Sequence, residues 1–140
     1  MADAPLYLLD TNVMSDMMRN PLRNTVQRFR KVLADHDTAT VCTSVVVQCE
    51  LLFGPRRRTH PRWQTHYDLL LEAVNVMPFE ADVAAHYAKL RAALEEAGAP
   101  IGPNDLLIAA HALALEATLV SADAEFQRVP GLKLENWLEV

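Results

Sequence analysis

Four acidic residues stand where their carboxylates could converge and do chemistry. Asp10 ends the apolar run PLYLLD, and Asp123 follows a second apolar run, ATLVS. Asp105 comes two residues after Pro103, in the expected first turn of a helix, where the helix dipole favours an ionised carboxylate. Glu50 lies in the mostly apolar segment SVVVQCELLFG, which we expect to form a helix from about Ser44 that is buried nearly all round. Because a carboxylate taken out of water is costly without a partner, each of these acids needs a physical explanation.

A divalent metal ion is the explanation that accounts for all four together. Carboxylates gathered without a basic partner repel one another and cannot all remain ionised. Ligation by oxygen atoms alone favours Mg²⁺ or Mn²⁺, and such an ion can activate water and neutralise a phosphodiester. We expect Asp10 and Asp105 to be the principal ligands. Glu50 would be a ligand or would orient the water, and Asp123 would hold a second ion or contact water.

Neutral oxygen atoms lie beside these acids. Thr11, Asn12 and Ser121 could orient the carboxylates or a substrate phosphate. They could equally be ordinary caps of the turns between strands and helices. The acids also have alternative roles without a metal. Asp10 could cap a helix, and Asp105 and Asp123 could be ordinary carboxylates at helix N-termini. Glu50 could form a buried ion pair with an arginine.

The elements that would position these residues follow from periodicity. Strand-like apolar runs alternate with helical segments, which predicts a parallel sheet with ligands beyond the carboxyl ends of its strands. The clearest helix spans residues 81–97 and stops at Gly98, and a second begins at Pro103 and runs to about Ala117. We expect an α/β protein with a central, mainly parallel sheet of four to five strands flanked by helices. The expected strands are PLYLLD, TATVCTS, VNVMPF, ATLVSAD and LKLENW.

Composition limits the remaining possibilities. The chain has 140 residues, is 51% hydrophobic and carries 13 basic against 18 acidic residues, for a net charge of −5. This length predicts one domain over residues 1–140. The absence of a long apolar run or signal sequence predicts a cytoplasmic protein without a membrane partner. Cys42 and Cys49 are too far apart for a C-x-x-C redox pair and too few for a zinc site or a disulfide framework, so we expect both to be reduced core residues.

Two other functions fit part of the pattern. An Asp after an apolar strand can be the nucleophile of a phosphotransfer site, which also needs a Lys to balance the phosphoryl charge. Of the three lysines, only Lys133 could lie near a strand end on the acidic side. A non-catalytic module that binds a basic helix is the other alternative, although binding one Arg requires fewer than four carboxylates.

Four segments carry a resemblance to a known family. LLDTNV, CELLFG, IGPNDLLIAAHA and LVSADAEFQRVPGLKLENW, in this order, resemble the PIN-domain ribonucleases, specifically the VapC-type toxins of type II toxin–antitoxin pairs. The resemblance spans residues 6–137 and implies a PIN-like fold. It also implies Mg²⁺ or Mn²⁺ bound by Asp10, Glu50, Asp105 and Asp123. Ala122 replaces the Asn common in the family, which puts a second metal site in doubt more than the first.

The resemblance further implies an endoribonuclease that cuts transfer or ribosomal RNA and so inhibits translation. Family members form homodimers and are silenced by an antitoxin that places an Arg in the acidic pocket. Candidate RNA contacts here are Arg56, Arg57, Arg58 and Arg62. Candidate antitoxin contacts, most of which we expect to be core residues instead, are Val13, Met14, Met17, Met18, Leu51, Leu52 and Phe53.

Overall fold

A five-stranded parallel sheet forms the centre of the protein. The computed structural model describes residues 4–20, 24–35, 39–57 and 61–138, except for the side chains of residues 55–57. Every strand pairing in the sheet is parallel, and the strand order is β3-β2-β1-β4-β5. The strands are β1 (Leu6–Leu9), β2 (Thr40–Ser44), β3 (Asn75–Met77), β4 (Thr118–Val120) and β5 (Lys133–Glu135). The expected fold class and all five expected strands are therefore confirmed.

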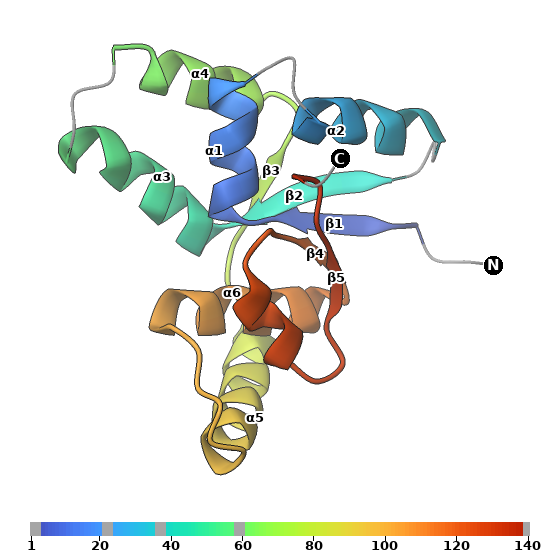
Figure 1. Ribbon diagram of the computed structural model, residues 1–140, viewed down its shortest axis with the longest axis vertical. Helices are drawn as coiled ribbons and strands as arrows, with labels where there is room; N and C mark the ends of the chain where they lie inside the picture. Colours follow the sequence, from blue (N-terminus) through green and yellow to red (C-terminus); the bar gives the residue numbers. More distant parts are fainter. Residues whose placement is uncertain (1–3, 21–23, 36–38, 58–60, 139–140) are drawn as a thin grey trace.

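Helices cover both faces of this sheet (Figure 1). Helices α1, α2 and α4 lie on one side, α5 and α6 lie on the other, and α3 extends from the end of β2 to contact α1, α4 and α6. The bounds are α1 (Thr11–Arg19), α2 (Asn24–Asp35), α3 (Val45–Arg57), α4 (Trp63–Leu70), α5 (Ala81–Glu96), α6 (Pro103–Leu115) and the 3₁₀ helix η1 (Ala124–Arg128). Within the residues described, no helix is both long enough and apolar enough to cross a membrane.

The core lies between the sheet and these helices. Leu8 and Leu9 of β1 are fully buried, because the strand has helices on both faces. Helix α6 is also buried along much of its length, and its alanines, including Ala109 and Ala112, let it pack closely between the sheet and α5. Burying a leucine side chain stabilises a fold by roughly 1.5–3 kcal/mol, so β1 and α6 form a firm support for the residues at their ends.

Two helix ends fix the position of α6. Gly98 follows α5 with a φ of +68°, a left-handed conformation that favours glycine. The chain then turns through Pro100 and enters α6 at Pro103, whose fixed φ suits a first helical position. Glu116 ends α6, also in the left-handed region, with a φ of 55°. The predicted helices over residues 81–97 and from Pro103 are thus confirmed to within two residues.

Helix α3 differs from what its apolar sequence predicts. We expected it to be buried nearly all round, but Phe53 is 58% exposed and Glu50 is partly exposed. Cys49 is also exposed, so the prediction that both cysteines are core residues is wrong for Cys49 and right for Cys42. The reason is geometric, because Cys49 and Phe53 are one helical turn apart and share the face of α3 that no described element covers.

Candidate metal-dependent active site

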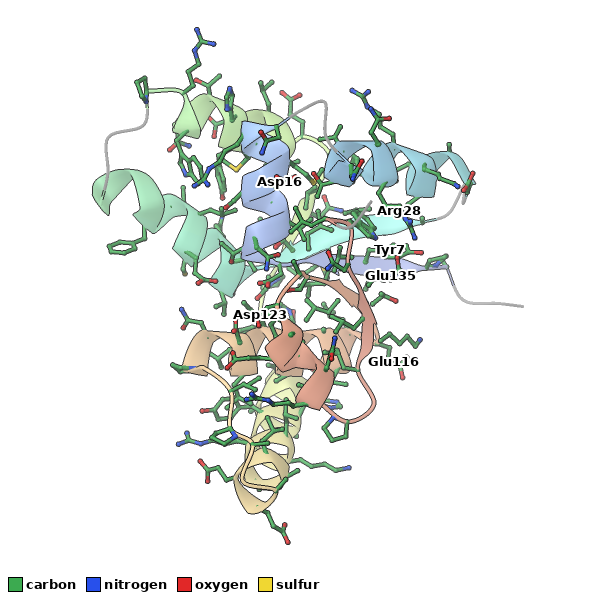
Figure 2. The ribbon with its side chains drawn as sticks, viewed as in Figure 1. Tyr7, Asp16, Arg28, Glu116, Asp123 and Glu135 are labelled. Atoms are coloured by element: carbon green, nitrogen blue, oxygen red, sulfur yellow. The ribbon has the colours of Figure 1, made fainter. Side chains whose placement is uncertain are left out.

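The acidic residues gather where the topology of the sheet changes direction. The chain proceeds from β1 outward to β2 and β3, then returns to place β4 on the other side of β1. Ligands of open α/β sheets bind at such a point, beyond the carboxyl ends of the strands. Asp10 directly follows β1, and Ser121 and Asp123 follow β4. In Figure 2, Asp123 lies beyond the carboxyl end of β4, and Glu116 lies before its amino end.

Asp10 is a buried carboxylate that does not cap its helix. Only 4% of the residue is exposed, and its backbone N–H donates to the carbonyl of Val120 at 2.9 Å. Although Asp10 precedes α1, its side chain makes no capping hydrogen bond, so the helix-cap alternative fails. Its Oδ2 accepts a hydrogen bond from Ser121 Oγ at 2.7 Å. Burial raises the pKa of Asp10, and the negative charges of Glu50 and Asp123 raise it a little further. The hydrogen bond from Ser121 acts in the opposite direction and lowers it.

Glu50 reaches this site from α3. Thr11 Oγ1 donates a hydrogen bond to Glu50 Oε1 at 2.6 Å, which ties Glu50 to the residue next to Asp10. Among the described residues, this hydrogen bond holds the carboxylate, and the ion pair with an arginine considered as an alternative is not seen. Since no other described residue donates a hydrogen bond to Glu50, its second oxygen can still accept one from a ligand.

Ser121 connects the ends of β1 and β4. Besides donating to Asp10, its Oγ accepts from the backbone N–H of Asp123 at 3.0 Å and from Asn12 Nδ2 at 3.4 Å. Asn12 Oδ1 in turn accepts from the N–H of Ala122 at 3.4 Å. Ser121 thus holds Asp10 and also caps the turn after β4, and Asn12 contacts this turn through Ser121 and Ala122, so the two roles considered for these residues are not exclusive.

A second group of carboxylates lies next to Asp10. Single carboxylate oxygens of Asp105, Asp123 and Glu125 all lie within 4.8 Å of one another. Asp123 Oδ1 accepts from the N–H of Glu125 at 2.9 Å, which caps η1 and fixes the pair. Burial raises the pKa of Asp105 to about 7, reinforced by the negative charges of Asp10, Asp123 and Glu125 and by a hydrogen bond with Asp123.

Glu125 is the site residue that the sequence analysis missed. It lies two residues after Asp123, in the segment SADAEFQ, where a second acid at the start of a short helix is unremarkable. The signal that could have identified it is this spacing, since a turn after Asp123 brings its neighbour back toward the same oxygen atoms.

The other sequence-based candidates are placed as follows. Arg62 is exposed and directly precedes α4. Arg58 and the side chains of Arg56 and Arg57 lie outside the described part of the structure. Phe53 is exposed and Leu52 is partly buried, whereas the remaining apolar candidates are core residues, as we expected for most of them. These core residues are Val13, Met14, Met17, Met18 and Leu51.

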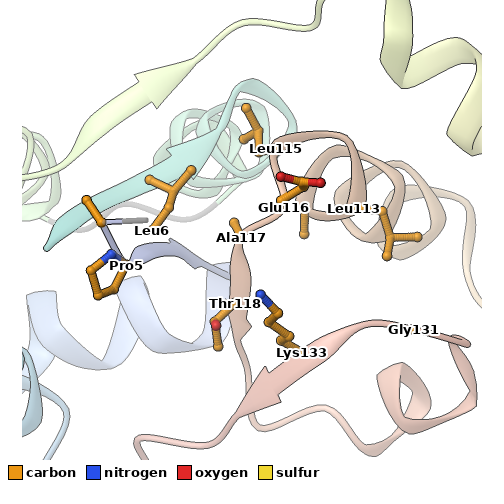
Figure 3. A pocket seen from close by; sticks show the side chains of 11 residues that line it. Pro5, Leu6, Leu113, Leu115, Glu116, Ala117, Thr118, Gly131 and Lys133 are labelled. Carbon is orange, nitrogen blue, oxygen red and sulfur yellow. The ribbon is translucent and has the colours of Figure 1, made fainter. Parts of the chain in front are cut away.

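A cavity of about 710 Å³ lies at the amino ends of the strands, opposite the carboxyl ends where the acids gather (Figure 3). Its lining includes Leu6, Thr118 and Lys133, which begin β1, β4 and β5. None of the acidic-site residues Asp10, Glu50, Asp105, Asp123 and Glu125 lines it. The cavity is therefore separate from the acidic site, despite its size.

Comparison with known proteins identifies the family. A family model described as PIN domain matches residues 7–132, and the chain therefore belongs to the PIN domain family. Within it the chain groups with VapC proteins. It is 37% identical to Ribonuclease VapC2 of Rickettsia felis, covering 94% of this chain and 98% of the relative. It is 33% identical to Ribonuclease VapC1 of Haemophilus influenzae, with the same coverage.

Solved structures agree with this grouping. The fold matches a chain of VapBC2 from Rickettsia felis, crystallised with a promoter DNA fragment, with a TM-score of 0.87 and 33% identity over 94% of this chain and 98% of the other. It matches a chain of VapBC-1 from nontypeable Haemophilus influenzae with a TM-score of 0.85 and 32% identity over 96% and 99%. VapBC-5 from Mycobacterium tuberculosis, described as a member of the VapBC family of toxin-antitoxin systems, matches with a TM-score of 0.65 and 25% identity over 94% and 96%.

Proposed function

We propose that this protein is a Mg²⁺- or Mn²⁺-dependent endoribonuclease that hydrolyses RNA phosphodiester bonds. The observation that carries the proposal is the acidic group beyond the carboxyl ends of β1 and β4. Buried Asp10 lies there under the influence of the charges of Glu50 and Asp123, and Asp105, Asp123 and Glu125 can bring carboxylate oxygens within 4.8 Å of one another. The names of the relatives, Ribonuclease VapC2 and Ribonuclease VapC1, support a nuclease.

The residues present fit a hard divalent cation. Every candidate ligand supplies oxygen, and three carboxylates can bring oxygen atoms within 4.8 Å of one another. The raised pKa values of Asp10 and Asp105 report repulsion and burial that a bound cation would relieve. When bound, the ion supplies an activated water and charge neutralisation for a phosphodiester.

Each residue of the chain has a separate task in this proposal. Asp10 and Asp105 would hold the cation, and Asp123 and Glu125 would complete the charge around it or hold a second one. Glu50, fixed by Thr11, orients the attacking water. Ser121 holds Asp10 by a hydrogen bond that favours the charged form and so opposes the rise in the pKa of Asp10 that burial causes.

The substrate and partners are inferred from the relatives. A relative in Salmonella typhimurium, 29% identical, is named tRNA(fMet)-specific endonuclease VapC, so we take transfer RNA as the first substrate class, with ribosomal RNA as the alternative. Structural neighbours named VapBC support an antitoxin as the partner of this chain. In this proposal the chain acts in the cytoplasm as a homodimeric toxin that inhibits translation. Phe53, exposed on α3, is the antitoxin contact we favour among the apolar candidates.

The phosphotransfer alternative lacks the lysine that it needs beside the acids. Lys133 was the lysine that could have balanced a phosphoryl group. It begins β5 and lines the cavity at the amino ends of the strands, away from the acids (Figure 3). The interaction-module alternative gains no support either, since a pocket for one guanidinium would not require so many carboxylates.

The proposal is tested by incubating purified protein, free of antitoxin, with a mixed pool of transfer and ribosomal RNA. Cleavage should require Mg²⁺ or Mn²⁺ and stop with EDTA. Asp10→Asn and Asp105→Asn should each lower the rate at least about 100-fold, because each removes a metal ligand. Asp35→Asn, which changes an exposed acid at the end of α2, is the matched control and should cut at the wild-type rate.

Two results would refute the proposal. One is a folded wild-type protein that cuts no RNA and shows no Mn²⁺ binding by calorimetry. The other is metal-dependent cleavage that survives both Asp10→Asn and Asp105→Asn, which would point to a contaminating nuclease or a different site.

A further inference from the structure

Arg128 is a cation held at the rim of the acidic site. It ends η1, the short helix that begins just after Asp123. Its Nη1 donates a hydrogen bond to the carbonyl of Pro100 at 3.0 Å, and the same nitrogen lies 3.9 Å from Glu125 Oε1. The arginine therefore bridges η1 and the loop that leads into α6, which carries Asp105.

The surroundings of Arg128 differ from those of the other paired arginines in the described part of the chain. Arg28 pairs with Glu135 between α2 and β5, and Arg91 pairs with Glu95 within α5. Arg128 pairs with Glu125, whose carboxylate lies within the acidic group. Of these three, Arg128 is thus the arginine joined directly to the site.

An anionic substrate needs such a cation. An RNA strand brings one negative charge per phosphate to a site that already holds several carboxylates, and a divalent ion offsets only two of those charges. Both contacts of Arg128 use Nη1, and 48% of its side chain is exposed. A guanidinium has five N–H donors in a planar fork that suits phosphate oxygens. The Pro100 bond pre-orients this fork while leaving donors for a ligand.

We propose that Arg128 binds a backbone phosphate of the RNA next to the bond that is cut. This inference rests on the proposed ribonuclease function and assigns a substrate contact to the same site. Glu125 keeps the guanidinium near the site when no substrate is present. Bound RNA then supplies a phosphate that replaces this long ion pair.

The test separates substrate binding from catalysis. Binding of a fluorescein-labelled single-stranded RNA of mixed sequence is measured in the Asp10→Asn background between about 50 and 200 mM salt, and cleavage is measured in the otherwise wild-type protein. Arg128→Gln should weaken binding about 5- to 10-fold for every sequence and reduce the salt slope by roughly one contact. In cleavage, KM should rise by a similar factor while kcat stays within about 2-fold.

Two variants control for charge and for fold. Arg128→Lys restores the positive charge and should recover most of the salt slope, although it loses the planar fork. Arg91→Gln removes an arginine with 56% side-chain exposure whose ion pair, with Glu95, lies within α5, and it should leave binding unchanged. Thermal melting of Arg128→Gln within about 2 °C of Arg91→Gln would show that the fold is intact.

Specific outcomes would overturn the inference. A fall in kcat or in Mn²⁺ affinity with KM unchanged would mean that Arg128 only positions η1 and its acids. Binding by Arg128→Gln equal to that of Arg91→Gln would mean that the arginine makes no substrate contact. Failure of the wild type to cut any RNA refutes the proposed function separately, because the binding series still reports on Arg128.

Discussion

At the scale of single residues, Ser121 opposes the effect of burial on the pKa of Asp10. Its hydroxyl donates to Asp10 Oδ2 at 2.7 Å and so lowers a pKa that burial raises. Ser121→Ala removes that donor, and the pKa of Asp10 should rise further. We therefore expect the acid limb of the pH–rate profile to move to higher pH, and activity near neutral pH to fall about 10- to 100-fold, as for lost outer contacts of metal ligands.

Ser15→Ala is the control for this change. Ser15 lies on α1, is partly buried and is not among the residues of the acidic site. Its pH–rate profile should match the wild type. If Ser121→Ala lowers activity equally at every pH, the serine holds the backbone turn rather than the charge of Asp10.

Some residues of this site could be predicted from local sequence patterns, and others depend on tertiary contacts. Asp10, Asp105 and Asp123 could be found because strand ends and a helix start are readable from local patterns. Glu50 required the resemblance or an assumption about depth, since its tie to Thr11 joins residues 39 positions apart. Glu125 and Arg128 were missed because their importance arises from the turn after Asp123 and the approach of the loop at Pro100, which are tertiary features.

At the scale of secondary-structure elements, the end of α6 carries backbone strain. Glu116 has a φ of 55°, and a left-handed conformation costs an L-residue roughly 1–2 kcal/mol. Glu116→Gly removes this cost but increases the entropy of the unfolded chain, so we expect a net gain of about 0.5–1 kcal/mol in the free energy of unfolding. Urea denaturation should show a higher midpoint with an unchanged slope.

A glycine placed inside a helix should instead lower the stability of the fold. Ala93 is exposed in the last third of α5, where glycine costs roughly 0.5–1 kcal/mol relative to alanine. Ala93→Gly should therefore lower the midpoint. A loss of stability in Glu116→Gly as large as that in Ala93→Gly would show that the glutamate side chain stabilises this turn by more than its backbone strain costs.

Most elements could be predicted because their patterns are local. Helix α5 follows from the buried positions Val83, Leu90 and Leu94, and α6 follows from Pro103 at its start. Helix α3 was misjudged because an apolar composition does not reveal which face meets a neighbour. Its exposed face at Phe53 is set by how α3 leaves the end of β2, and a single sequence does not contain that angle.

At the scale of the whole molecule, the acidic site couples stability to pH. The pKa of Asp105 is about 7 in the folded protein, against an ordinary value of 3.8, and that of Asp10 is raised as well. Between these values the folded state binds more protons than the unfolded state. The free energy of unfolding therefore falls as pH rises through this window, and the stabilising contribution is present below about pH 4 and lost above about pH 7.

This linkage predicts a melting temperature that depends on pH and metal together. In EDTA, the wild type should melt at a lower temperature at pH 8 than at pH 5. Asp105→Asn removes one titrating carboxyl, so its melting temperature should depend less on pH and exceed the wild-type value at pH 8. Because a cation that binds only the folded state stabilises it, Mn²⁺ should restore the wild-type melting temperature at pH 8 and affect Asp105→Asn far less.

Asp35→Asn separates this effect from a general change in net charge, since it removes an equal charge from the exposed end of α2 and should follow the wild type at every pH. The decisive comparison is the slope in EDTA. If wild type and Asp105→Asn lose stability equally between pH 5 and pH 8, Asp105 is not the residue that titrates in this range. The metal response at pH 8 would then have to come from Asp10 and its neighbours alone, and calorimetry of Mn²⁺ binding to Asp105→Asn would show near wild-type affinity.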